Sequence, residues 1–187
     1  MKCNVPKSYL DLARAVVDTQ LGSKSGASNE DAIFSLLSCT YVYSYSALVS
    51  FCSAQLYILW NQDSSALKDK YKSCDSFEGL MAGPLKEIKN ALKELSLQYN
   101  LEPIHTARPK LWRHLNELLK NYRDFFLHPN PDHFQKYVGE TGNAQWCFAS
   151  DTASGILEYI YEGCRGEAPK WVNTSGLQSL GFKVVDI

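Results

Sequence analysis

The sequence predicts an all-α protein, a bundle of four to five main helices with short extra helices and an irregular C-terminal tail. In several long segments the apolar residues recur at three- and four-residue steps, the period of a helix packed against a core. Loops rich in Gly, Pro and Ser separate these segments. With 187 residues, 45% of them apolar, the chain can bury one substantial core. We therefore expect a single domain over 1–187, with its core in 7–163 and a tail in 164–187.

The first two predicted helices cover residues 8–21 and 32–62. The first ends at Gly22, and Ser28 or Asn29 can cap the second. The second contains no charged residue, and a segment of its length would allow a membrane span. Its serines, threonine, glutamine and tyrosines instead favour a long central helix that is buried on most sides and also suits a dimer interface. A protein anchored in a membrane through this segment is the alternative.

The rest of the chain adds a loop and four more helices. In chain order these are expected over 62–76 (the loop), 85–99, 110–128, 132–137 and 144–161. Pro129 disfavours a helical conformation at the residue before it, so the helix that starts at 110 ends there. Gly155 lies inside the last helix, where Gly costs about 1 kcal/mol relative to Ala, so we expect close packing at that point.

The predicted helix over 110–128 ends on residues that carry candidate chemistry: Arg123, Asp124, three apolar residues and His128. Arg is permanently charged and binds phosphate in a fork, whereas His titrates near neutral pH and moves a proton. Metal-free cleavage of a phosphodiester requires both. On a straight helix the two side chains would point about 140° apart, so convergence needs a non-ideal last turn, the reach of Arg123 or a second copy of the helix. The alternative is that both side chains only cap helix carbonyls.

An Arg, an Asn or Asp, three mostly apolar residues and a His, late in a helix of an all-helical domain, form a pattern that resembles the HEPN superfamily. The resemblance implies a homodimer whose two motifs share a cleft, and a metal-independent ribonuclease of a toxin–antitoxin or phage-defence system. Arg123 and His128 would then be catalytic, with Asn121 and Asp124 orienting them. The superfamily also implies the alternative of a non-catalytic module that binds a nucleotide, RNA or a protein partner. Two positions depart from the pattern: Asn130 replaces a tyrosine that one subgroup modifies, and Asp124 stands where Asn is commoner.

The charge distribution is uneven although the formal net charge is only −1. This net charge excludes a global nucleic-acid-binding signature. Residues 104–123, however, hold five Lys and Arg residues against one Glu. Lys110, Arg113 and Lys120 share the polar face of the helix over 110–128, where they could attract an RNA backbone. A merely solvated helix face is the alternative.

The six cysteines show no C-x-x-C spacing, and their positions are 3, 39, 52, 74, 147 and 164. Cys39, Cys52 and Cys147 lie in apolar helical stretches and resemble buried free thiols, which suits a reducing cytoplasm. None of the four histidines belongs to an H-E-x-x-H motif, and no Walker or G-x-G-x-x-G loop occurs. We therefore expect no metal and no cofactor. The expected partners are RNA, a second copy of the chain and an antitoxin protein, with no membrane.

Overall fold

A computed structural model describes residues 5–22, 30–119, 123–124, 127, 148–164 and 172 of the chain. Within these residues there are helices and no strand, so the predicted all-α class is confirmed. In chain order the helices are α1 (Val5–Gly22), α2 (Glu30–Trp60), α3 (Ala66–Lys70), α4 (Phe77–Ala82), α5 (Ile88–Gln98), α6 (Ile104–Ala107), α7 (Pro109–Arg113), the π-helix η1 (His114–Leu119) and α10 (Phe148–Cys164). The four longest of these, α1, α2, α5 and α10, form the bundle to which the shorter helices are added.

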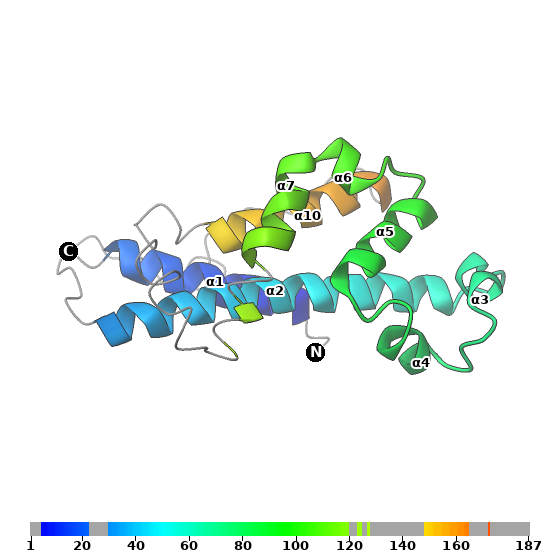
Figure 1. Cartoon of the computed structure of the whole chain (residues 1–187), viewed down its shortest axis with the longest axis horizontal. Helices are drawn as coiled ribbons and strands as arrows, with labels where there is room; N and C mark the ends of the chain where they lie inside the picture. The colour runs from blue at the N-terminus through cyan, green and yellow to red at the C-terminus, as the bar shows by residue number, and fades with distance from the viewer. Residues whose placement is uncertain are drawn as a thin grey trace.

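Helix α2 is the axis around which the other helices are arranged (Figure 1). Helix α1 runs antiparallel to it along one half, α10 lies over its middle, and α5 contacts the half that leads to α3. Because α2 carries no charge from residue 32 onward, it can meet several neighbours without burying an unpaired ion. The long uncharged stretch of the sequence therefore makes α2 the helix best suited to the centre of the bundle.

The burial of α2 can be followed over Ser38–Trp60. Its span Ser38–Trp60 is long and apolar enough to cross a membrane by length and composition, and half of that span is buried inside the fold. Leu48 and Leu56 face the core, whereas Tyr57 and Ile58 are about half exposed. Within Ser38–Trp60 only four residues are exposed, Val49, Ala54, Tyr57 and Ile58, and the others are buried or partly buried. This agrees with the predicted central helix and leaves a small uncharged strip in solvent.

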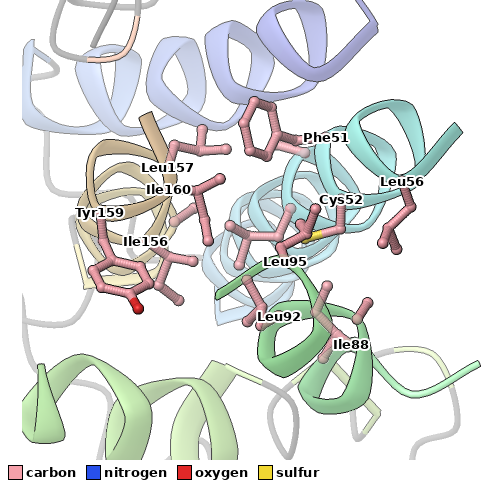
Figure 2. Packing of buried hydrophobic residues seen from close by; sticks show 14 of the residues in the cluster. Phe51, Cys52, Leu56, Ile88, Leu92, Leu95, Ile156, Leu157, Tyr159 and Ile160 are labelled. Carbon is pink, nitrogen blue, oxygen red and sulfur yellow. The ribbon is translucent and has the colours of Figure 1, made fainter. Parts of the chain in front are cut away.

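The core lies where α2, α5 and α10 meet (Figure 2). Side chains from all three helices interdigitate there, among them Phe51, Leu95 and Leu157, each almost fully buried. Each such side chain contributes about 1.5–3 kcal/mol relative to leaving it in water. Burial also raises the pKa of the Cys52 thiol to about 12, so this cysteine is an inert part of the core. Cys39 is free as predicted, and Cys147 lies outside the described residues.

Two short helices occur in and beyond the segment that the sequence predicts to be a loop. The Ser65 hydroxyl accepts a hydrogen bond from the Lys68 backbone N–H at 3.2 Å and starts α3. Ser76 starts α4 in the same way, through the Gly79 N–H at 3.1 Å. Each helix buries a single leucine, which is too few residues to produce a periodic pattern.

The last helix lies close to its predicted position, and one residue of the tail is described. Helix α10 begins at Phe148 and includes Gly155, where an added Cβ would lie 3.0 Å from the Leu111 methyl carbons, so the predicted close packing is confirmed. In the expected tail, Val172 is fully buried and its carbonyl accepts a hydrogen bond from Arg14 of α1. The tail therefore contributes at least one residue to the core. The predicted short helix over 132–137 lies outside the described residues.

Candidate functional site

The described residues of the segment over 109–127 are helical but do not form one straight α-helix. Helix α7 passes into η1, a six-residue π-helix over His114–Leu119, and residues 123–124 and 127 are again helical. A π-helix rotates less per residue than an α-helix, so directions calculated for a straight α-helix do not hold across η1. Inserted π-helical turns are rare and frequently occur at functional sites. The backbone before Arg123 is thus irregular where the candidate chemistry begins.

Arg123 packs its guanidinium group on an aromatic ring of the central helix. The guanidinium carbon lies 4.1 Å from the centroid of the Tyr45 ring, a cation–π contact. Only 23% of the Arg123 side chain is exposed. Because Tyr45 belongs to α2, the most extensively packed helix of the bundle, it is a firm support for the charge.

Asp124 makes the second contact to Arg123. Its Oδ1 lies 3.0 Å from Nη2 of Arg123, and 46% of the Asp124 side chain is exposed. Exposed ion pairs of this kind contribute only about 0–1 kcal/mol to stability. The structure therefore brings Arg123 and Asp124 together, as expected for an orienting carboxylate, while the carboxylate also cancels part of the positive charge.

One nitrogen of Arg123 is buried and unsatisfied in the described part of the chain. Its Nε makes no hydrogen bond to any residue that the structure describes. An unsatisfied buried donor costs about 1–3 kcal/mol. This arrangement would be unfavourable for a group that served only to stabilise the fold, and it leaves hydrogen-bonding capacity on Arg123 for an anionic oxygen after a local rearrangement.

The other predicted site residues divide into two groups. Lys110 and Arg113 lie on α7 and are exposed, as expected for side chains that meet an RNA backbone. Lys120, Asn121 and His128 lie outside the described residues. The convergence of Arg123 and His128 therefore stays a prediction, as does the proton-transfer half of the chemistry.

Two neighbours of the predicted residues were not indicated by the sequence. The contact of Tyr45 with Arg123 could not be predicted, because a tyrosine in an apolar helix is most simply interpreted as a packing residue. The second is Trp112 of α7, which has Lys93 Nζ at 5.9 Å from its ring centroid and the His105 ring at 6.0 Å. The available signal was a row of three lysines, Lys86, Lys89 and Lys93, along the predicted helix over 85–99, but periodicity alone assigns such a row to solvent.

Among the residues that the structure describes, no three His, Cys, Asp or Glu side chains come together in a group that could hold a metal ion. The described chemistry near Arg123 is that of a cation held in place by an aromatic ring and a carboxylate. Such an arrangement can bind and stabilise an anionic oxygen.

Comparisons with known proteins do not assign the chain to a family. No protein-family model matches it, no curated protein matches it, and no solved structure matches it. The resemblance to the HEPN superfamily therefore stays an expectation from the sequence motif between Arg123 and His128.

Proposed function

We propose that this protein binds RNA and cleaves it without a metal ion, as a ribonuclease of the HEPN type. The observation that best supports the proposal is the fixed position of the Arg123 guanidinium on Tyr45 and Asp124, with part of the side chain open to solvent. A charge that is positioned before the substrate arrives needs little reorganisation during the reaction, which is the main source of electrostatic catalysis.

The proposed reaction uses the RNA's own 2′-hydroxyl as the nucleophile. The 2′-oxygen forms a bond to the adjacent phosphorus while the bond from phosphorus to the 5′-oxygen breaks, giving a cyclic phosphate and a free 5′-hydroxyl. His128 removes the proton from the 2′-hydroxyl, and the His128 of a second copy delivers a proton to the leaving 5′-oxygen. Arg123 stabilises the negative charge that develops on the phosphate oxygens.

Substitution of the two motif residues tests this mechanism. We expect Arg123→Ala and His128→Ala each to abolish cleavage of a single-stranded RNA in the presence of EDTA, with the circular dichroism spectrum unchanged. Tyr45→Leu should lower the cleavage rate by removing the support of the guanidinium, whereas Tyr45→Phe keeps the ring and should retain most of the rate. Lys68→Ala, which removes a charge from α3, is the control. Undiminished cleavage in both motif variants would rule out the mechanism.

The proposal includes a homodimer in the cytoplasm, in a toxin–antitoxin or phage-defence system. The uncharged exposed face of α2, which includes Tyr57 and Ile58, is compatible with contact to a second copy. Light scattering after size-exclusion chromatography measures the mass in solution. Growth arrest on expression, relieved by His128→Ala or by a co-expressed antitoxin protein, would support the cellular role. Recovery of the protein in the membrane fraction would contradict the cytoplasmic location.

A second candidate function is a non-catalytic module that binds RNA, a nucleotide or a protein partner. The specific observation in its favour is Asp124, which lies 3.0 Å from Arg123 and opposes a phosphate at the same place. A salt series separates the two functions. RNA binding that weakens as salt rises, without any cleavage products after long incubation, would favour the module.

A further inference from the structure

We propose that a second surface of this protein, formed by α5, α6 and α7, binds single-stranded RNA. We name it the basic–aromatic patch, and its members are Lys93, His105, Arg108, Lys110, Trp112 and Arg113. Cationic side chains of the patch contact phosphates, and its rings contact a base. The inference rests on the proposed function for the identity of the ligand as RNA, and it adds the surface on which the substrate docks.

Trp112 is the centre of the patch, and side chains from two other helices lie against its ring. Lys93 of α5 places Nζ 5.9 Å from the ring centroid, and the His105 ring of α6 lies 6.0 Å away at an interplanar angle of 52°. The three helices follow one another on one side of α2, next to α10 (Figure 1). Trp112 is half-buried against the core, so its ring has a defined position and keeps part of its surface in solvent.

The charges of the patch are mostly uncompensated. Lys93, Lys110 and Arg113 are exposed, and no ion pair is found for them among the described residues. Arg108 forms a loose pair with Glu162 of α10 at 3.3 Å, in which both side chains are about half exposed. Such a pair is screened and weak, so a phosphate can compete for the guanidinium. The patch therefore has a clear positive surplus although the whole chain is almost neutral.

The combination of cations and rings favours single-stranded RNA over an acidic protein segment. Proteins that bind single strands pair a positive surface with aromatic side chains on which bases stack. An acidic peptide would use the cations but would gain little from Trp112 and His105. Because the bases of a duplex are already stacked on one another, the patch should also prefer single strands to duplexes.

The chain offers a matched control on α3, a helix outside the patch. Lys68 of α3 also lies over a tryptophan ring, with its Nζ 5.7 Å from the Trp60 centroid. The surroundings differ, since Asp63 and Asp69 are close in sequence and the neighbouring Lys70 is paired with Glu94. Lys68→Gln thus removes the same kind of contact without removing a charge from the patch.

The test is RNA binding measured by fluorescence anisotropy over a salt series. The probe is a short single-stranded 2′-O-methyl RNA, which cannot be cleaved through its 2′ position. We expect Lys93→Gln to weaken binding about threefold at low salt and to reduce the slope of log K against log salt by about 0.7, the value for one phosphate contact on a single strand. Trp112→Leu should weaken binding about fivefold or more through the lost base contact, with little change in slope. Lys68→Gln should change neither quantity.

The outcomes separate this proposal from the catalytic one. Binding of Lys93→Gln and His105→Ala equal to that of Lys68→Gln would overturn the patch, and these two surface variants keep the test valid if Trp112→Leu fails to fold. A poly-glutamate peptide that competes equally well against wild type and His105→Ala would also overturn RNA as the ligand. If Arg123→Ala loses cleavage but binds the probe normally, while Lys93→Gln binds weakly, both proposals hold. If no variant affects cleavage but Lys93→Gln still weakens binding, only the ribonuclease proposal fails.

Discussion

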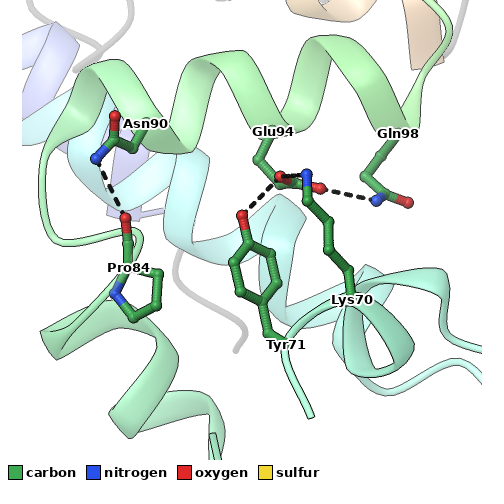
Figure 3. A network of polar contacts seen from close by, with 6 residues as sticks. All are labelled: Lys70, Tyr71, Pro84, Asn90, Glu94 and Gln98. Atoms are coloured by element: carbon green, nitrogen blue, oxygen red, sulfur yellow. Dashed lines mark hydrogen bonds and ion pairs between the residues drawn. The ribbon is translucent and has the colours of Figure 1, made fainter. Parts of the chain in front are cut away.

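Two charged pairs in this protein have similar chemistry and very different surroundings. Glu94 of α5 is only 3% exposed, and its carboxylate accepts hydrogen bonds from Lys70 at 2.6 Å, Tyr71 at 2.8 Å and Gln98 at 2.9 Å (Figure 3). Arg123, in contrast, meets one carboxylate and one ring, and its buried Nε has no hydrogen-bond acceptor among the described residues. Every donor near the Glu94 carboxylate is used in the fold, so that network has a structural role. Arg123 keeps one donor that the described fold does not use.

The protonation behaviour of Glu94 agrees with this role. Burial by itself raises the pKa of the Glu94 carboxyl, but hydrogen bonds from Lys70, Gln98 and Tyr71, together with the positive charge of Lys70, outweigh burial and hold the pKa below its ordinary value. The same contact with Glu94 raises the pKa of Lys70, which stays protonated. The pair thus holds α3 against α5 at neutral pH.

The largest predicted effect is a loss of stability when Glu94 is replaced. Glu94→Ala should lower the free energy of unfolding by about 1–3 kcal/mol, because Lys70, Tyr71 and Gln98 lose their common acceptor. Urea unfolding followed by circular dichroism measures the change. Glu162→Ala is the control, since its exposed pair with Arg108 should contribute less than about 0.5 kcal/mol. If Glu94→Ala and Glu162→Ala lost equal free energy of unfolding, the structural role assigned to the Glu94 network would be wrong.

Acid should remove the same stabilisation. A carboxyl whose pKa is lowered in the folded state contributes stability above its ordinary pKa, here 4.5, and that contribution is lost as the pH falls through the lowered value. The stability difference between wild type and Glu94→Ala should therefore be full at neutral pH and shrink below about pH 4.5. Unfolding curves over a pH series test this, and a difference that grows on acidification would refute the assigned direction.

Asp124→Asn tests whether the carboxylate next to Arg123 weakens RNA binding. The change removes a negative charge next to Arg123 and keeps the shape of the side chain. We expect RNA binding to tighten about fivefold, because two unit charges about 4 Å apart interact by about 1 kcal/mol in water. The Kd for non-cleavable RNA, measured for wild type and variant at the same salt concentration, checks this. Weaker binding would show instead that Asp124 is needed to hold the guanidinium.

The smallest predicted effect is on the stability of the Arg123 variant. Arg123→Gln removes a cation–π contact and an exposed pair, each contributing at most about 1 kcal/mol, and it also removes an unsatisfied buried donor. These terms offset one another, so the free energy of unfolding should change by less than about 1 kcal/mol. A loss above about 2 kcal/mol, comparable with that of Glu94→Ala, would show that Arg123 is structural after all.

The long helices were predictable because their signal is local. Apolar periodicity placed helices over 8–21, 32–62, 85–99 and 144–161, and the structure has α1, α2, α5 and α10 there, with ends that differ by a few residues. Helices α3, α4 and α6 were missed, since each has four to six residues and buries one apolar side chain. The π-helical turn η1 was missed as well, because the residues before Arg123 show the ordinary helical period.

The candidate site was predictable only in part. Residue chemistry singled out Arg123 and Asp124, which are adjacent in the chain and form the expected pair. It did not single out Tyr45 under the guanidinium, because that contact joins two distant segments. The same reason hid the arrangement of Lys93 and His105 around Trp112.

The sequence by itself determined the helical class and the main helices, because periodicity is a property of neighbouring positions. Side-chain chemistry, which is equally local, singled out the residues that we propose to bind phosphate. Only the tertiary structure decided that the Glu94 carboxylate has three hydrogen-bond donors, that Arg123 lies on the ring of Tyr45 and that Lys93 of α5 and His105 of α6 lie against Trp112 of α7. The physical reason is that these contacts depend on how helices far apart in the chain pack around α2, and packing is set by the shape of the whole core.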